Sequence, residues 1–111
     1  MLNARMLIAL ALLALISAQA RADEPAHIAL TIQDHRYTPD EIHVPAGKPV
    51  ILDIENKDPM AEEFDSSSMH IEKVIPGGRK GIVRLHALDA GKYPFIGEYH
   101  SDTAKGILIA E

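Results

Sequence analysis

Residues 91–111 read GKYPFIGEYHSDTAKGILIAE and give the strongest indication of the fold of this chain. Within residues 92–98 the aromatic residues Tyr93 and Phe95 stand two positions apart, and a second apolar run covers residues 106–110. Alternation with a period of two is typical of a half-buried β-strand. A short polar segment, YHSDTAK at residues 99–105, joins the two runs. The stretch therefore predicts two strands with a functional loop between them, because rigid β-scaffolds commonly carry their binding residues on loops.

The same alternation recurs upstream, between turns rich in proline and glycine, and no segment of the domain shows a helical period. Short alternating segments separated by such turns are typical of an all-β sandwich or barrel. We expect about seven strands. They are predicted around residues 28–32, 42–44, 50–54, 69–75, 81–88, 92–98 and 106–110.

The N-terminal segment, residues 1–22, has the composition of a secretory signal peptide. Arg5 precedes an apolar run over residues 7–18, and small residues follow at Ala18, Ala20 and Ala22. This order of charged, apolar and small residues is that of a cleaved signal, and the apolar run is short for a bilayer span. We expect residues 23–111 to form one exported domain, most simply in a bacterial periplasm. An uncleaved membrane anchor is the alternative.

The composition excludes several classes of function. The chain has 16 acidic and 11 basic residues, a net charge of −5 and no basic stripe, which argues against nucleic acid as a partner. It has no cysteine, so a domain in an oxidising compartment would rest on packing alone. The G-x-S-x-G and H-E-x-x-H motifs are both absent, which argues against conventional hydrolysis.

Candidate metal ligands gather in the segment KDPMAEEFDSSS, residues 57–68, and around His100. Carboxylates and imidazole suit Cu(II), Fe(II), Fe(III), Mn or Zn better than Cu(I). Residues two apart in an extended segment point to the same side, so Glu98 and His100 are expected to share one ion. The expected core ligands are Glu63, Glu98 and His100. The lesser candidates are Glu62, Asp65, Met60, Met69, His70 and Glu72.

Each candidate also has a purely structural interpretation. Acidic loops are often solvated surface, which is the alternative for residues 57–68. Met69 alternates with Ile71 and is expected in the core, which places His70 on the opposite side. Three further histidines are expected on the solvated surface, namely His35, His43 and His86.

The order of these parts resembles the cupredoxin family. Its usual opening, from an aromatic residue to a strand ending in Asn, matches Tyr37, Pro39, Ile42, Val44, Gly47, Val50 and Asn56. In blue-copper members, a G-x-Y-x-F strand ends in Cys, and a His and a Met follow. Those places here are Gly97, His100, and Ala104 or Lys105. The resemblance implies a Greek-key β-sandwich, while the lack of cysteine excludes a type 1 copper centre, which needs a Cu–thiolate bond.

The segments AEEFDS, EKVIPGG, GKYPFIGEYH and TAKGILIAE are similar to the small periplasmic cupredoxin-like component of bacterial ferrous-iron uptake systems. They are also similar to the cupredoxin-like domain of periplasmic iron-uptake lipoproteins. The resemblance implies binding of copper, iron or both, with periplasmic or membrane iron-uptake components as partners. It also implies oxidation of Fe(II) for a permease that takes Fe(III). Two roles are therefore considered, namely ferroxidase-type activity and a binding or accessory role without catalysis.

An alternative of a different class stays open at this point. A metal-free β-sandwich could dock a permease or a periplasmic partner through its acidic loops. A homodimer is also open, since a second subunit could complete the coordination sphere of an ion. The sequence does not distinguish copper from iron, because nitrogen and oxygen sites favour copper whatever the biological metal is.

Overall fold

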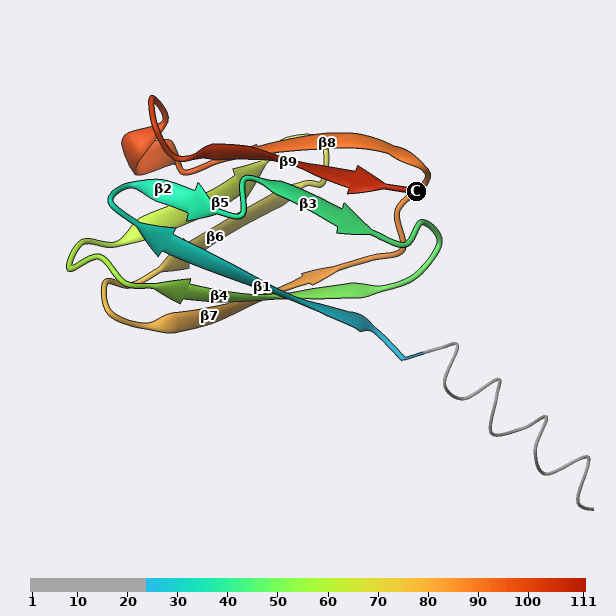
Figure 1. Cartoon of the computed structure of the whole chain (residues 1–111), viewed down its shortest axis with the longest axis horizontal. Coiled ribbons are helices and arrows are strands. Elements are labelled where there is room, and N and C mark those ends of the chain that lie inside the picture. The colour runs from blue at the N-terminus through green and yellow to red at the C-terminus, as the bar shows by residue number, and fades with distance from the viewer. Residues whose placement is uncertain (1–23) are drawn as a thin grey trace, which may run out of the picture.

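The computed structural model describes residues 24–111, which form two β-sheets packed face to face (Figure 1). The segment predicted to be a signal peptide lies outside these residues. The strands are β1 (Ala26–Gln33), β2 (Arg36–Thr38), β3 (Glu41–Val44), β4 (Val50–Asn56), β5 (Glu62–Ser66), β6 (Ile71–Ile75), β7 (Lys80–Leu85), β8 (Gly91–Ile96) and β9 (Lys105–Ala110). One turn of 3₁₀-helix, η1 (Glu98–His100), follows β8. Over the described residues, no helix is long and apolar enough to cross a membrane.

The chain passes repeatedly between the two sheets, as in a Greek-key sandwich. One sheet has the strand order β2-β1-β4-β7, and the other has the order β3-β9-β8-β5-β6. The pairs β1–β4 and β3–β9 are parallel, and the other pairs are antiparallel. The predicted all-β sandwich is confirmed.

The core lies between the sheets and is centred on three aromatic rings. Phe64 and Phe95 are stacked with ring centroids 4.9 Å apart, and Tyr37 meets Phe95 edge to face at 5.2 Å. The buried Tyr37 hydroxyl donates a hydrogen bond to the Glu63 carbonyl oxygen over 2.6 Å. Burial, together with the carboxylates nearby, raises the pKa of Tyr37 well above its usual value, so the hydroxyl stays a donor. The core thereby fixes the position of β5 and of the acidic residues on it.

Within the described residues there are nine strands rather than about seven, and the additional strands are β2 and β5. The difference at β5 matters, because residues 57–68 were expected to be an irregular polar segment. Glu62 is 1% exposed and Glu63 is 5% exposed, so solvated surface is the wrong interpretation of these two residues. Four of the five residues of β5 are polar, so the strand carries no apolar alternation that periodicity can detect.

Asn56 joins the β4–β5 loop to the strand beyond it. Its side-chain amide donates to the carbonyl oxygens of Met60 and Ile75 over 2.9 and 3.0 Å. Its side-chain oxygen accepts from the Asp58 N–H over 3.0 Å. Because Asn56 is fully buried, these hydrogen bonds fix the path of the chain that leads into β5.

Candidate metal centre

The structure brings most of the predicted ligands together, but in two clusters rather than one. The inner cluster consists of His35, Glu62 and His100. The outer cluster consists of Glu63, Asp65, Glu72 and Glu98. In each cluster, one ligand atom from every member lies within 4.8 Å of the others. Glu62 and Glu63 are neighbours on β5, and successive side chains of a strand point to opposite faces, so the two clusters lie on opposite sides of this strand.

Glu62 is the centre of the inner cluster, and both of its carboxylate oxygens are hydrogen-bonded. Oε1 accepts from the N–H groups of Glu63 and Tyr99 over 2.9 and 3.2 Å. Oε2 lies 2.5 Å from Nδ1 of His100. Hydrogen bonds to a buried carboxylate replace those it loses from water, which is why a charged side chain can lie inside the sandwich here.

Gly97 makes room for the Glu62 carboxylate. A Cβ atom at this position would lie 2.7 Å from the Glu62 carboxyl carbon and 2.8 Å from the Ala104 Cβ. The position that carries the thiolate in the cupredoxin pattern is therefore filled here by a carboxylate from β5. A type 1 copper ion does not fit this donor set, whereas an ion that accepts imidazole and carboxylate does.

His100 and His35 reach the inner cluster from two different turns. His100 lies on η1, and its ring is stacked on that of His35, with centroids 3.7 Å apart and planes 16° apart. His35 lies in the tight turn between β1 and β2, where Asp34 and His35 both have positive φ, at 53° and 56°. Two consecutive positive φ values are the signature of a two-residue hairpin turn of type I′.

Asp58 holds this turn in place. Its carboxylate accepts from the N–H groups of Asp34 and His35 over 2.8 and 2.9 Å, and Oδ2 lies 3.6 Å from Nδ1 of His35. Burial alone would raise the pKa of Asp58, but hydrogen bonds from the two N–H groups and the nearby imidazoles bring it below its ordinary value. On the other side, the Thr103 hydroxyl donates to the His35 carbonyl oxygen over 2.6 Å.

The placement of His35 corrects the sequence-based expectation that it lies on solvated surface. It is half-buried and belongs to the inner cluster. Periodicity could not find it, because its partners lie on β5 and η1, far away in the sequence. The available signal was local: an Asp-His pair between two strands, at the positions of a tight hairpin turn.

The outer cluster gathers four carboxylates on the exposed face of the five-stranded sheet. Asp65 is directly opposite Glu72 on β6, and Glu63 and Glu98 complete the group. Glu63 is almost fully buried, and its Oε1 atom has no hydrogen-bond partner among the described residues. Burial, and then the neighbouring Glu98 carboxylate, raise the pKa of Glu63 to about 7. Like charges on opposite positions of two paired strands are destabilising. Binding of a proton or a cation would therefore stabilise this group of carboxylates.

The expected core trio of Glu63, Glu98 and His100 does not form one cluster, and this is a correction. The prediction assumed an extended segment, in which residues two apart share a side. Glu98 and His100 instead lie on one turn of 3₁₀-helix, where three residues complete a turn and residues two apart diverge. Glu98 therefore joins Glu63 in the outer cluster, and His100 joins Glu62 in the inner one.

The two methionine candidates lie in different surroundings. Met60, in the β4–β5 loop, is 56% exposed. Met69 is partly buried against the core in the turn after β5, as its alternation with Ile71 predicted. His70, beside it, is exposed and has a positive φ of 55°. Met69 and His70 therefore lie at the end of β5 away from Glu62.

Two packed β-sheets in this strand order, with His100 at the histidine place of the family pattern, are typical of the cupredoxin class. The chain belongs to the cupredoxin-like domain family, whose model matches residues 6–110. It is 36% identical over 87 residues to an uncharacterized protein of Rickettsia prowazekii, a match that covers 78% of this chain and 70% of that one.

Solved structures show the same fold. Auracyanin A, a "blue" copper protein of Chloroflexus aurantiacus, has a TM-score of 0.68 at 15% identity over 79% of this chain and 100% of its own. The metal-binding domain of the Cu(I)-exporting P-type ATPase of Streptococcus pneumoniae D39, solved with Cu(I), has a TM-score of 0.68 at 17% identity over 77% and 84%. Amicyanin of Paracoccus versutus has a TM-score of 0.60 at 20% identity over 81% and 87%. The protein is thus related by fold to copper-binding proteins.

Proposed function

We propose that this protein is exported to the periplasm and binds metal ions there in the service of ferrous-iron uptake, with iron on the outer cluster and copper on the inner one. The observation that carries the proposal is Glu63. Its Oε1 atom is buried and without a hydrogen-bond partner among residues 24–111, and three further carboxylates surround it. An unpaired polar atom inside a like-charged group is costly unless a cation or a proton completes it.

The ligand atoms of the two clusters favour different metal ions. Four carboxylates are hard anionic donors, which hold Fe(III) more strongly than Fe(II) and so favour loss of an electron from iron. Two imidazoles and one carboxylate form a nitrogen and oxygen set that suits Cu(II). Oxidation releases one electron per iron ion, and copper, when bound, supplies a one-electron acceptor. The residues of this chain would bind the two ions on the two sides of β5. Glu62 holds the His100 ring through its hydrogen bond with Nδ1, and Asp58 holds the turn that carries His35.

Separate titrations with Cu(II) and with anaerobic Fe(II), followed calorimetrically, test the proposal. We expect Glu63→Gln/Glu98→Gln to lose iron binding and keep copper, and His35→Ala/His100→Ala to show the reverse. The exposed carboxylates Glu41 and Glu55 provide the matched control, because Glu41→Gln/Glu55→Gln removes the same charge from other strands. Binding of both metals that survives both cluster variants would contradict the proposed sites.

An oxidation assay then separates ferroxidase action from binding alone. Fe(II) would be mixed anaerobically with the protein carrying one equivalent of Cu(II), and loss of the Cu(II) electron paramagnetic resonance signal would be followed. We expect the wild type to lose this signal faster than the outer-cluster variant does. Equal rates of signal loss in the wild type and the variant would indicate that the protein binds metal ions but does not itself oxidise Fe(II).

Export is tested by the mature N-terminus. Expression of the full chain in a bacterium, osmotic-shock fractionation and N-terminal sequencing should give a periplasmic protein that starts at Asp23. A chain that keeps residues 1–22 and sediments with membranes would instead be anchored.

A further inference from the structure

We propose that the free edge of β7 binds an extended acidic segment of a partner protein, which adds to the four-stranded sheet as a further strand. The inference goes beyond the proposed metal function and does not depend on it, because the residues that would contact the partner, Lys80, Ile82 and Arg84, lie outside both clusters. It rests on three features of the β6–β7 region: an unpaired strand edge, a segregated positive charge and an alternating exposed face.

The edge of β7 is open. Within residues 24–111, β7 is the last strand of the four-stranded sheet and pairs only with β4, while β6 is the last strand of the other sheet and pairs only with β5. A hollow of about 260 Å³ is lined by residues of both strands, among them the cations Lys73 and Arg84 and one carboxylate, Glu72. An edge strand presents a row of N–H and C=O groups to which a further strand can pair.

The segment that carries this edge is basic, in contrast to the acidic chain as a whole. Residues 73–88 contain no acidic residue, although the whole chain has 16 and a net charge of −5. The basic residues of this segment are all exposed, namely Lys73, Arg79, Lys80 and Arg84. Every ion pair among residues 24–111 involves a histidine, so none of these four cations is paired within the described part of the chain. The edge therefore complements an anionic partner.

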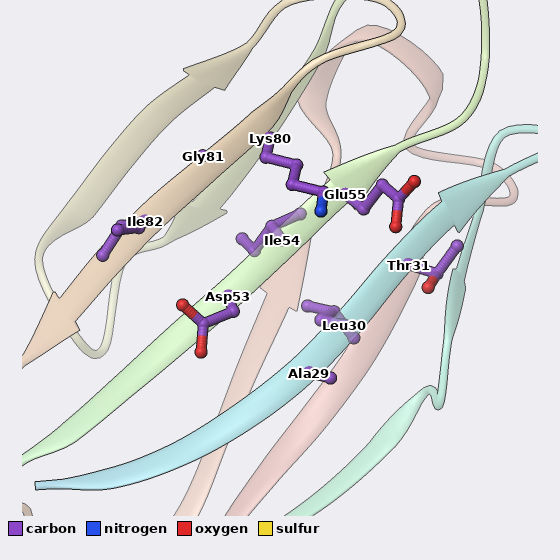
Figure 2. Close-up of a pocket in the computed structure, with 9 residues that line it drawn as sticks. All are labelled: Ala29, Leu30, Thr31, Asp53, Ile54, Glu55, Lys80, Gly81 and Ile82. Carbon is purple, nitrogen blue, oxygen red and sulfur yellow. The ribbon is translucent and has the colours of Figure 1, made fainter.

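Charged and apolar side chains alternate on the outer face of β7, and this pattern indicates which partner strand would fit. Lys80, Ile82 and Arg84 point outward, and Ile82 is 49% exposed. Figure 2 shows Lys80 and Ile82 on the outer face, with the Lys80 side chain extending across β4 toward Glu55. Ile82 lines both the hollow of about 310 Å³ in Figure 2 and the hollow at the β6 edge, so the side chain is uncovered on two sides. A strand with acidic residues opposite the two cations and an apolar residue between them fits this face.

The same charges argue against a second copy of β7 as the occupant. Pairing β7 with its own copy would bring the Lys80 and Arg84 side chains of two chains onto one short ribbon. Like charges across a strand pair are destabilising, and basic residues on edge strands commonly prevent self-pairing. The geometry therefore favours a partner of different sequence, whose strand is acidic at alternate positions.

A synthetic peptide tests the proposal against the protein purified after expression of the full chain. The peptide carries glutamates at the positions opposite Lys80 and Arg84, valine between them, and threonines at the alternate positions. We expect Lys80→Glu/Arg84→Glu to weaken binding by about tenfold, since each exposed pair contributes modestly. Lys48→Glu/Lys92→Glu makes the same charge change away from this edge and should bind like the wild type. In hydrogen–deuterium exchange, the peptide should protect amides of β7.

Three results would overturn the proposal. The first is equal affinity for the wild type and the Lys80→Glu/Arg84→Glu variant. The second is unchanged affinity for a peptide whose alternate amides are N-methylated, because such a peptide cannot form the ladder and its binding would be electrostatic only. The third is absence of peptide binding together with binding of anionic phosphatidylglycerol vesicles, which would assign the basic surface to a membrane.

Discussion

Glu62 and Glu63 are identical side chains on adjacent positions of one strand, both buried, yet they are stabilised in opposite ways. Glu62 has hydrogen bonds to both carboxylate oxygens, from two backbone N–H groups and one imidazole. Glu63 has one oxygen without a partner among the described residues and lies beside three further carboxylates. The fold itself therefore stabilises the inner carboxylate, whereas the outer carboxylate needs a bound proton or cation.

Removing the inner carboxylate should have the largest effect on stability. Glu62→Ala leaves the N–H groups of Glu63 and Tyr99 and the His100 ring without their acceptor, and we expect a loss of about 3 kcal/mol. Urea unfolding in the presence of a chelator measures it. The adjacent variant Glu63→Ala is the matched control, and it should unfold close to the wild-type midpoint. Equal destabilisation by both variants would remove the contrast between the two faces of β5.

Filling the space at Gly97 should have the next largest effect. In Gly97→Ala the added Cβ would lie 2.7 Å from the Glu62 carboxyl carbon and 2.8 Å from the Ala104 Cβ. Overpacking of this kind typically costs about 2 kcal/mol. Thermal unfolding of Gly97→Ala beside Gly78→Ala distinguishes crowding from backbone strain, because Gly78 has a positive φ but no atom within 4 Å of an added Cβ. A Gly97→Ala variant as stable as the wild type would mean that the Glu62 carboxylate can move away.

Loss of the Asp58 acceptor should loosen the inner cluster more than it weakens the fold. Asp58→Asn keeps one acceptor oxygen but loses the negative charge that strengthens the hydrogen bonds from the N–H groups of Asp34 and His35. We expect about 1 kcal/mol of destabilisation and a change in the magnetic resonance signals of the His35 and His100 rings. Asp40→Asn, an exposed carboxylate on another turn, is the control. Unchanged ring signals in Asp58→Asn would show that Thr103 alone fixes the turn.

The sequence predicted the elements whose residues carry their own pattern. Alternation in residues 50–54 and 92–96 reports burial on one face, and both segments are strands. β5 escaped prediction because its burial is made possible by partners on η1 and on other strands, such as the N–H of Tyr99 and the Tyr37 hydroxyl. Residue types were sufficient to nominate Glu62, Glu63, Glu98 and His100. Their division into two clusters follows from the 3₁₀ turn at residues 98–100, which periodicity does not predict.

Substitution in the outer cluster should have the smallest effect on stability, and the direction of this effect with pH is well defined. The pKa of Glu63 is raised to about 7 from an ordinary value near 4.5, so the folded state holds this proton more tightly than the unfolded state does. The associated stability is fully present below about pH 4.5 and is lost as the pH rises through 7. Glu63→Gln keeps the shape and removes this loss, so the variant should match the wild type in stability at pH 4 and exceed it at pH 8.

Addition of a metal ion distinguishes the two possible partners of the buried Glu63 oxygen, a cation and a proton. With a chelator present, the difference between Glu63→Gln and the wild type should grow as the pH rises from 4 to 8. With Fe(III) supplied as a soluble citrate complex, the wild type should gain stability at neutral pH and the variant should not, because a ligand that binds only the folded state stabilises it. An iron effect of equal size in both proteins would place the ion elsewhere. In that case the buried oxygen of Glu63 would be completed by a proton alone, and the two faces of β5 would differ only in their pKa values.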